Sequence, residues 1–164
     1  MSPPAAIAIL AAGRGTRLRP LTFVVPKALL AIPFAGKKLI SWALEASQAT
    51  PFPTYVLVRG KHADRFRNCI RDPRITVASS DFEAETGGEI MRHVAMGLFT
   101  PYEHIVVLPS DYHMQGLDIN VLVSTARSQS LDLLLLCDVP QDSGDFVLTN
   151  DSGRAITIVP TATE

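Results

Sequence analysis

The residues of this chain that could do chemistry are concentrated near its amino terminus, where residues 8–30 read AILAAGRGTRLRPLTFVVPKALL. Gly13 and Gly15 follow an apolar run, and Arg17 and Lys27 follow the glycines. Glycine lets the backbone approach an anion closely, and successive backbone N–H groups in such a loop can bind phosphate oxygens. Arginine adds a planar fork of donors, and lysine adds a compact charge. The stretch therefore predicts a site for a nucleotide or another polyphosphate.

Two other nucleotide-binding patterns do not fit this stretch. A Walker loop needs Gly-Lys-Ser/Thr at the start of a helix, but Lys27 lies far beyond the glycines. A dinucleotide fingerprint needs a third glycine where this chain has Leu18, and it needs an acid about 20 residues further on. The next helix reaches Glu45 only later. These departures argue against a hydride-transfer enzyme.

The elements that position these residues alternate between short apolar runs and amphipathic segments, which predicts an α/β sandwich with a largely parallel sheet. We expect a long loop over residues 11–33, at the carboxyl ends of the strands, where ligands bind in such sheets. Strands are expected at residues 5–10, 54–60, 74–79, 104–113 and 131–139, helices at 37–49, 61–72, 90–99 and 118–129, and a hairpin at 145–160. The apolar face of the third helix is expected to be Ile90, Val94 and Leu98.

Composition narrows the class of protein further. The chain has 164 residues, of which 47% are hydrophobic and 19% charged, and a net charge of -1, so we expect one globular domain and no nucleic-acid partner. No apolar run approaches the about 20 residues that cross a bilayer, so we expect no membrane partner. The amino terminus lacks a basic region before its apolar run, which indicates a cytoplasmic protein. Cys69 and Cys137 match no metal or redox spacing and are expected to be reduced core thiols.

The opening stretch resembles the signature of the sugar-1-phosphate nucleotidyltransferases. The positions that match it are Gly13, Gly15, Thr16, Arg17, Pro20, Leu21, Thr22, Pro26 and Lys27. The resemblance implies a three-layer α/β/α sandwich of the nucleotide-diphospho-sugar transferase (Rossmann-like) type. It also implies transfer of a nucleotidyl group from a nucleoside triphosphate to a sugar 1-phosphate, which gives an NDP-sugar and pyrophosphate.

The same resemblance implies roles for individual residues. EAETGGEI resembles the segment that lines the base pocket, and VVLPSDYHM lies where the family has a strand ending in Gly-Asp, with Ser110 here in place of the glycine. The implied catalytic residues are Arg17, Lys27 and Asp111, with Asp111 also the ligand of Mg²⁺. The implied nucleotide-binding residues are Leu10, Ala11, Ala12, Gly13, Gly15, Thr16, Glu85, Thr86, Gly87 and Gly88, and Gly144 is implied to contact the sugar.

The carboxyl-terminal part departs from the family. A lysine that binds the sugar phosphate follows the hairpin in the family, whereas this chain reads TIVPTATE, and a later metal-binding aspartate is also absent. The resemblance therefore implies one nucleotidyltransferase domain over residues 1–164 with its carboxyl-terminal part missing. Three interpretations stay open: an enzyme, alone or completed by a homo-oligomer or a partner chain; a non-catalytic nucleotide- or NDP-sugar-binding regulatory module; or a truncated inactive fragment.

Overall fold

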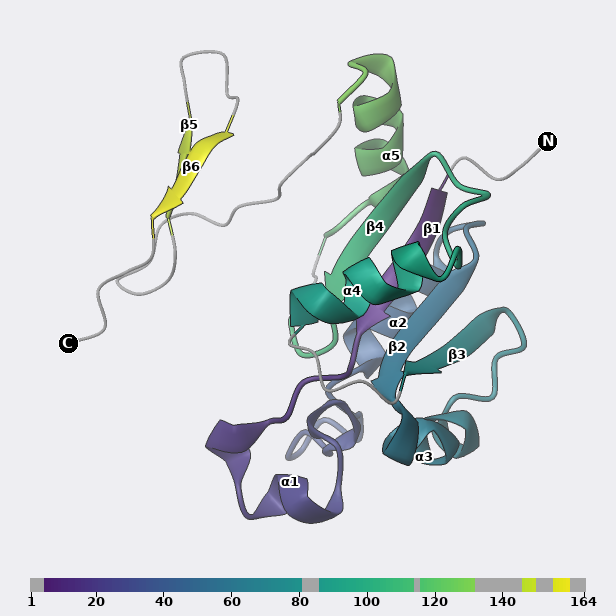
Figure 1. Cartoon of the computed structure of the whole chain (residues 1–164). Coiled ribbons are helices and arrows are strands. Elements are labelled where there is room, and N and C mark those ends of the chain that lie inside the picture. Colours follow the sequence, from purple (N-terminus) through teal and green to yellow (C-terminus); the bar gives the residue numbers. More distant parts are fainter. Residues whose placement is uncertain (1–4, 81–85, 114–115, 132–145, 150–154, 160–164) are drawn as a thin grey trace. The chain divides into compact units, whose positions relative to one another are not determined.

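The computed structural model describes residues 5–80, 86–113, 116–131, 146–149 and 155–159 (Figure 1). The chain forms two compact units, Met1–Gln129 and Ser130–Glu164. The first unit is built on a parallel sheet with the strand order β3-β2-β1-β4. Its strands are β1 (Ala5–Leu10), β2 (Thr54–Arg59), β3 (Ile75–Ser80) and β4 (His104–Pro109). The predicted sheet is therefore confirmed for these four strands.

Strand β1 lies in the middle of the sheet because nearly every residue in it is small or apolar. Residues Ala5 to Ile9 are completely buried. Such a continuous apolar run suits a strand that is covered on both faces. Leu10 pairs with Leu57 of β2 on one side and with Pro109 of β4 on the other. The carboxyl ends of β1 and β4 therefore lie level with each other.

Helices cover both faces of the sheet, which makes three layers (Figure 1). Ile7 and Ile9 face a core shared with α2 (Ser41–Gln48), α3 (Ala63–Cys69) and α5 (Ile119–Ser128). Ala6 and Ala8 face the other way, in a second cluster that Ile90 of α4 joins. Helix α4 spans Thr86–Ala95. The alternation along β1 thus sorts the helices between two layers, and the predicted sandwich is confirmed.

The segment between β1 and α2 contains more regular structure than the predicted loop. It forms the short helix α1 (Leu21–Val24) and two 3₁₀ turns, Thr16–Leu18 and Lys27–Leu29. Leu29 is 7% exposed and packs in the core with Ala28. The second turn is therefore anchored from below, although it lies in the middle of a long connection.

Helix α4 differs from its prediction at both ends and at one of its expected apolar positions, whereas Ile90 and Leu98 pack against the second cluster as expected. It begins at Thr86, not at Ile90. Its buried side chains include Glu89 and His93, whereas Val94 is 41% exposed. The Ser80 hydroxyl donates to Glu89 Oε1 at 2.7 Å, so a polar contact with β3 lies on the buried side of the helix, where the pattern predicted only apolar side chains. The spacing of apolar residues could not predict that a charged residue such as Glu89 is buried, because its burial is compensated by a hydrogen bond.

The remaining sequence expectations fare differently. Strands β5 (Phe146–Thr149) and β6 (Ala155–Val159) pair antiparallel, which confirms the strands of the predicted hairpin. The strand predicted at residues 131–139 falls, from residue 132 on, outside the described residues.

The two cysteines were predicted to be core thiols. Cys69 is exposed and accepts a hydrogen bond from Lys38 Nζ at 3.1 Å, so its prediction as a core thiol is wrong. Cys137 lies outside the described residues. Among the helices that the structure describes, none has the length and apolar character needed to cross a bilayer.

The packing predicts a large difference between two identical substitutions. Phe66 on α3 is fully buried, whereas Phe23 on α1 is 69% exposed. We expect Phe66→Ala to lower the free energy of unfolding by about 3–5 kcal/mol because it removes a buried ring. We expect Phe23→Ala to change it by no more than about 1 kcal/mol. Urea unfolding followed by the fluorescence of Trp42, the one tryptophan of the chain, measures both. Equal losses would contradict the packing of α3 on the core.

Candidate functional site

The candidate site begins where β1 ends. The Ala11 N–H donates to the Leu57 carbonyl at 2.9 Å, which extends the β1–β2 ladder by one step. The Arg59 Nε–H then donates to the Ala12 carbonyl at 2.7 Å. Ala11 and Ala12 are both buried, whereas Gly13 is exposed. The chain therefore leaves the sheet at Gly13, and residues 11–16 are called the glycine loop below.

Gly15 holds the sharp turn in the glycine loop. Its φ of 60° lies in the left-handed region, which glycine adopts without strain. A Cβ at this position would lie 2.8 Å from Thr22 Cγ2 and 3.1 Å from Lys27 Cβ. The Thr22 hydroxyl donates to the Gly15 carbonyl at 2.8 Å. The chain thus folds back on itself here, which places Lys27 against the glycine loop.

Lys27 and Asp111 form an ion pair between Nζ and Oδ2. Lys27 lies in the turn that Ala28 and Leu29 anchor, and Asp111 follows the end of β4. Both side chains are about one-third exposed, at 37% and 34%, so solvent reaches the pair and screens its attraction. The arrangement places a cation and an anion side by side at the carboxyl edge of the sheet.

The ion pair borders a small cavity of about 140 Å³. The lining comes from the ends of β1 and β4, the glycine loop and the anchored turn: Leu10, Ala11, Gly13, Lys27, Ala28, Pro109, Ser110 and Asp111. Pockets that enclose a whole drug-sized ligand measure about 300–1,000 Å³. The cavity therefore suits a small charged group, such as one phosphate, and leaves the rest of a larger ligand outside it.

The other predicted site residues lie around this cavity or beyond it. Arg17 and Thr16 lie in the exposed turn after Gly15 and do not line the cavity. Thr86, Gly87 and Gly88 form the first turn of α4. Glu85 and Gly144 fall outside the described residues. The structure thus brings together Gly13, Lys27 and Asp111, together with the strand ends that carry them.

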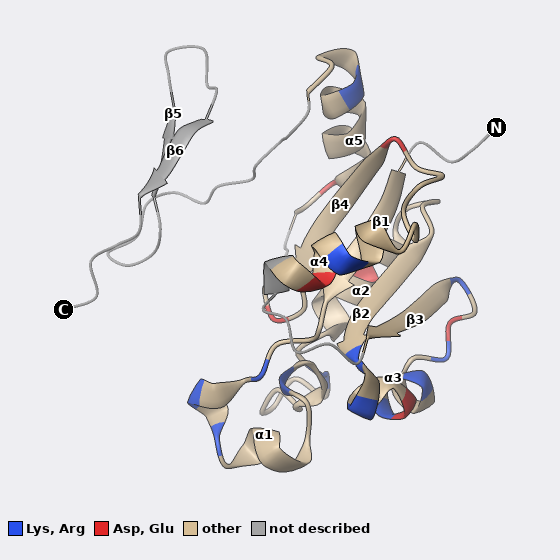
Figure 2. Ribbon diagram, in the orientation of Figure 1, with Lys and Arg blue, Asp and Glu red and all other residues tan. Residues whose placement is uncertain are grey.

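Positive charge gathers on the same side of the sheet (Figure 2). The pKa of His62, just beyond β2, is lowered first by its burial and then by Lys61, Arg65 and Arg59. Lys and Arg residues also follow Gly13 along the chain (Figure 2). Among the residues that the structure describes, no three or more His, Cys, Asp or Glu side chains gather as a metal cluster. The cations around His62 and after Gly13 make this edge suited to an anionic ligand.

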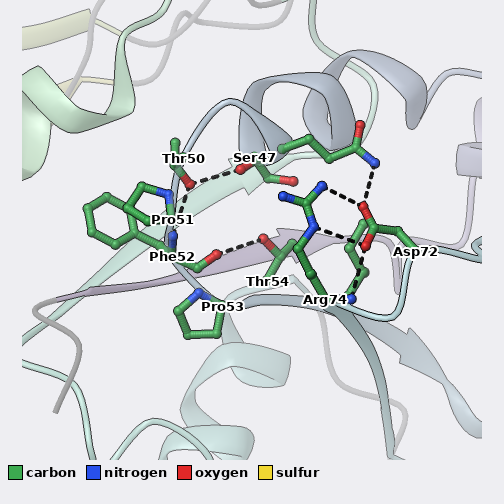
Figure 3. Close-up of a pocket in the computed structure, with 10 residues that line it drawn as sticks. Ser47, Thr50, Pro51, Phe52, Pro53, Thr54, Asp72 and Arg74 are labelled. Carbon is green, nitrogen blue, oxygen red and sulfur yellow. Dashed lines mark hydrogen bonds and ion pairs between the residues drawn. The ribbon is translucent and has the colours of Figure 1, made fainter.

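A larger cavity of about 310 Å³ lies elsewhere, at the amino ends of β2 and β3 (Figure 3). Asp72 there accepts from the Arg74 side chain and from the Gln48 amide, and the Arg74 bonds hold the pKa of Asp72 well below its usual range. Phe52 and two prolines form the apolar wall. None of the residues predicted for the site lines this cavity. Ligands of open α/β sheets bind at the opposite, carboxyl edge.

Sequence reasoning missed three contacts of the site. In the sequence, Arg59 is only a polar residue near the end of a predicted strand, and no local pattern relates it to Ala12. Thr22 matched the resemblance but had no role until its bond to Gly15. Trp42 on α2 lies against His113, with ring centroids 4.8 Å apart. The contacts of Arg59 and Trp42 join segments far apart in the chain, and the contact of Thr22 depends on the fold-back after Gly15, so only the fold could reveal them.

Comparison with known proteins agrees with this geometry. Residues 6–145 match a family described as nucleotidyl transferase. Over 155 residues the chain is 32% identical to the bifunctional protein GlmU of Ralstonia nicotianae, an alignment that covers 93% of this chain and 32% of that protein. It is also 32% identical over 155 residues to an N-acetylmuramate alpha-1-phosphate uridylyltransferase of Neisseria meningitidis, with 88% and 64% covered.

A UTP–glucose-1-phosphate uridylyltransferase of Synechocystis is 29% identical over 167 residues, with 91% of this chain and 42% of that protein covered. The chain thus spans between about a third and two-thirds of the length of these relatives. The family match covers most of the chain, including the glycine loop, Lys27 and Asp111. The chain therefore belongs to the nucleotidyl transferase family.

Proposed function

We propose that this chain binds a nucleoside triphosphate at the carboxyl edge of its sheet and transfers the nucleotidyl group to a sugar 1-phosphate. The observation that carries the proposal is the convergence of Lys27 and Asp111 beside Gly13. Relatives whose names state a uridylyltransferase activity on sugar 1-phosphates support it. The site would act in the cytoplasm, without a nucleic-acid or membrane partner.

The proposed reaction needs positioning and charge more than proton transfer. A phosphate oxygen of the sugar 1-phosphate attacks the α-phosphorus, the bond from that phosphorus to the bridging oxygen breaks, and pyrophosphate leaves with the electron pair. The attacking phosphate is already ionised at neutral pH, so no general base is required. Lys27 would hold the reacting phosphates, and backbone N–H groups of the glycine loop would hold the polyphosphate. Arg17, on the exposed turn, would neutralise the departing pyrophosphate.

Asp111 is the described residue best placed to hold Mg²⁺. Its carboxylate is part-exposed, lines the cavity and lies beside Lys27. Mg²⁺ commonly takes one or two protein carboxylates and fills its remaining positions with water and substrate phosphates. A single carboxylate therefore fits a metal that arrives with the triphosphate. When bound, the ion would neutralise charge on the reacting phosphates.

The remaining assignments follow from the family membership and stay proposals. Thr86–Gly88, at the start of α4, would lie against the base. Glu85 would join them, and Gly144 would contact the sugar. Completion of the site by a second copy or by a partner chain is also part of the proposal.

The test is a calorimetric titration of each common nucleoside triphosphate with and without Mg²⁺, followed by pyrophosphate release with a panel of sugar 1-phosphates. Binding with pyrophosphate release supports transfer. Binding without release identifies a nucleotide-binding module in place of an enzyme. If none of the triphosphates binds, the proposed function is wrong.

Lys27 and Asp111 predict losses of rate in an active assembly. We expect Lys27→Met and Asp111→Asn each to lower the rate of pyrophosphate release by about 10²–10³, as removal of a charge-stabilising group commonly does. The matched control is Lys37→Met, because Lys37 forms an exposed ion pair with Glu45 at 2.6 Å, away from the cavity. Its rate should stay within about twofold of the original protein. Equal losses in all three variants would refute a specific role of the pair.

Substitution of the two glycines of the loop should affect different properties, the triphosphate affinity at Gly13 and the stability of the fold at Gly15. A Cβ at Gly13 would meet no atom within 4 Å, so Gly13→Ala should leave stability within about 0.5 kcal/mol while filling space needed by phosphate. We expect its triphosphate affinity to fall about tenfold, the value of one hydrogen bond. Gly15→Ala should lower the free energy of unfolding by about 1–3 kcal/mol because of its positive φ and the contact with Thr22. Calorimetry and urea unfolding measure the two effects, and equal destabilisation would contradict the loop geometry.

A further inference from the structure

We propose that Arg59 is a positioning residue for the glycine loop: its Nε–H holds the Ala12 carbonyl, and this bond presents the Gly13 N–H to the polyphosphate. The inference rests on the proposed function, since it names the residue that shapes the phosphate-binding backbone. Arg59 does not line the cavity, and it lies outside the opening stretch of residues 8–30.

The contact is a side-chain extension of the sheet. Arg59 is the last residue of β2, and its Nε lies 2.7 Å from the Ala12 carbonyl oxygen. The preceding backbone bond runs from the Ala11 N–H to the Leu57 carbonyl at 2.9 Å. Ala12 is only 6% exposed, so its carbonyl needs a protein partner. Arg59 thus continues the ladder by one residue beyond the backbone.

Peptide geometry transmits this bond to Gly13. The peptide unit between Ala12 and Gly13 is planar and trans, so its C=O and N–H point in opposite directions. A carbonyl held toward β2 therefore turns the Gly13 N–H away from β2. Gly13 lines the cavity beside Lys27 and Asp111, and the space that a Cβ would take there is open. Without the bond to Arg59, this peptide unit could rotate, because glycine tolerates most backbone angles.

The charge of Arg59 explains its role in the site less well than its hydrogen bond to Ala12 does. Lys61 and Arg65 lie in the same neighbourhood, since both lower the pKa of His62 together with Arg59. Arg59 is therefore one of several cations at this edge. Its directed bond to Ala12 is the feature that its cationic neighbours do not share in the described contacts.

Two substitutions separate the bond from the charge. In Arg59→Gln, the amide nitrogen lies the same number of bonds from Cα as Arg Nε, so a neutral donor stays in place. In Arg59→Lys, a methylene takes the position of Nε, so the charge stays but the donor moves one bond further out. Arg59→Met keeps an unbranched side chain that reaches as far as the position of Arg Nε, and it removes both properties. Lys61→Met is the matched control, because it removes a neighbouring charge and leaves the bond to Ala12 intact.

The experiment uses the full chain and two independent measurements. Titration with nucleoside triphosphates gives the dissociation constant, and ¹⁵N NMR of the ligand-free protein gives the shift and order parameter of the Gly13 amide. We expect Arg59→Gln and Lys61→Met to stay within about threefold of the original affinity, and Arg59→Lys and Arg59→Met to lose about tenfold. The Gly13 amide should shift and lose order only in the lysine and methionine variants.

The pattern of results decides the role of Arg59. In an active assembly, Arg59→Met should raise KM for the triphosphate about tenfold and change kcat little, because the Gly13 N–H holds the polyphosphate in both ground and transition states. Retained affinity in Arg59→Lys with loss in Arg59→Gln would overturn the inference in favour of charge. Unchanged Gly13 signals in all three Arg59 variants would overturn it too. If the original protein binds no triphosphate, the proposed function fails, and the Gly13 amide still tests the bond.

Discussion

The rest of the site depends on the burial of β1 on both faces of the sheet. A strand with no exposed face can carry no polar side chain along its length, so its first functional atoms appear where it ends. The parallel ladders to β2 and β4 fix that end, because Leu10 pairs with Leu57 on one side and Pro109 on the other. Asp111 can therefore lie beside the glycine loop even though about a hundred residues separate them along the chain.

The sequence predicted the sheet and the glycine-rich connection after its first strand well, because both leave local signals. The apolar run at residues 5–10 is typical of a strand buried on both faces, and Gly13 and Gly15 follow it closely. Helix α4 was predicted less well. Its buried Glu89 accepts a hydrogen bond from Ser80 on β3, and its buried His93 contacts the Glu89 carbonyl. A pattern of apolar spacing contains no information about such a partner.

The candidate site shows the same division between local and long-range signals. Lys27 and Asp111 could each be selected from the sequence, the first by its place after the glycines and the second by the resemblance. Their pairing could not be predicted, since it requires both the sheet register and the fold-back at Gly15. Arg59 was invisible for a similar reason. Its partner is a backbone carbonyl, and a carbonyl looks the same at every position of a sequence.

The ion pair between Lys27 and Asp111 balances the charge of a part-exposed site. Lys27 and Asp111 form an ion pair, so the charge of each side chain is compensated by the charge of the other. Under the proposed function, an entering phosphate with its cation would offer each side chain a new partner of the right sign, so that the two charges would separate with little electrostatic loss. Ala28 and Leu29 hold the backbone of Lys27 against the core, so its side chain would change partner while the backbone stays in place. The part of the site that packing holds in place is thus apolar and buried, and its charged groups lie in the part-exposed portion.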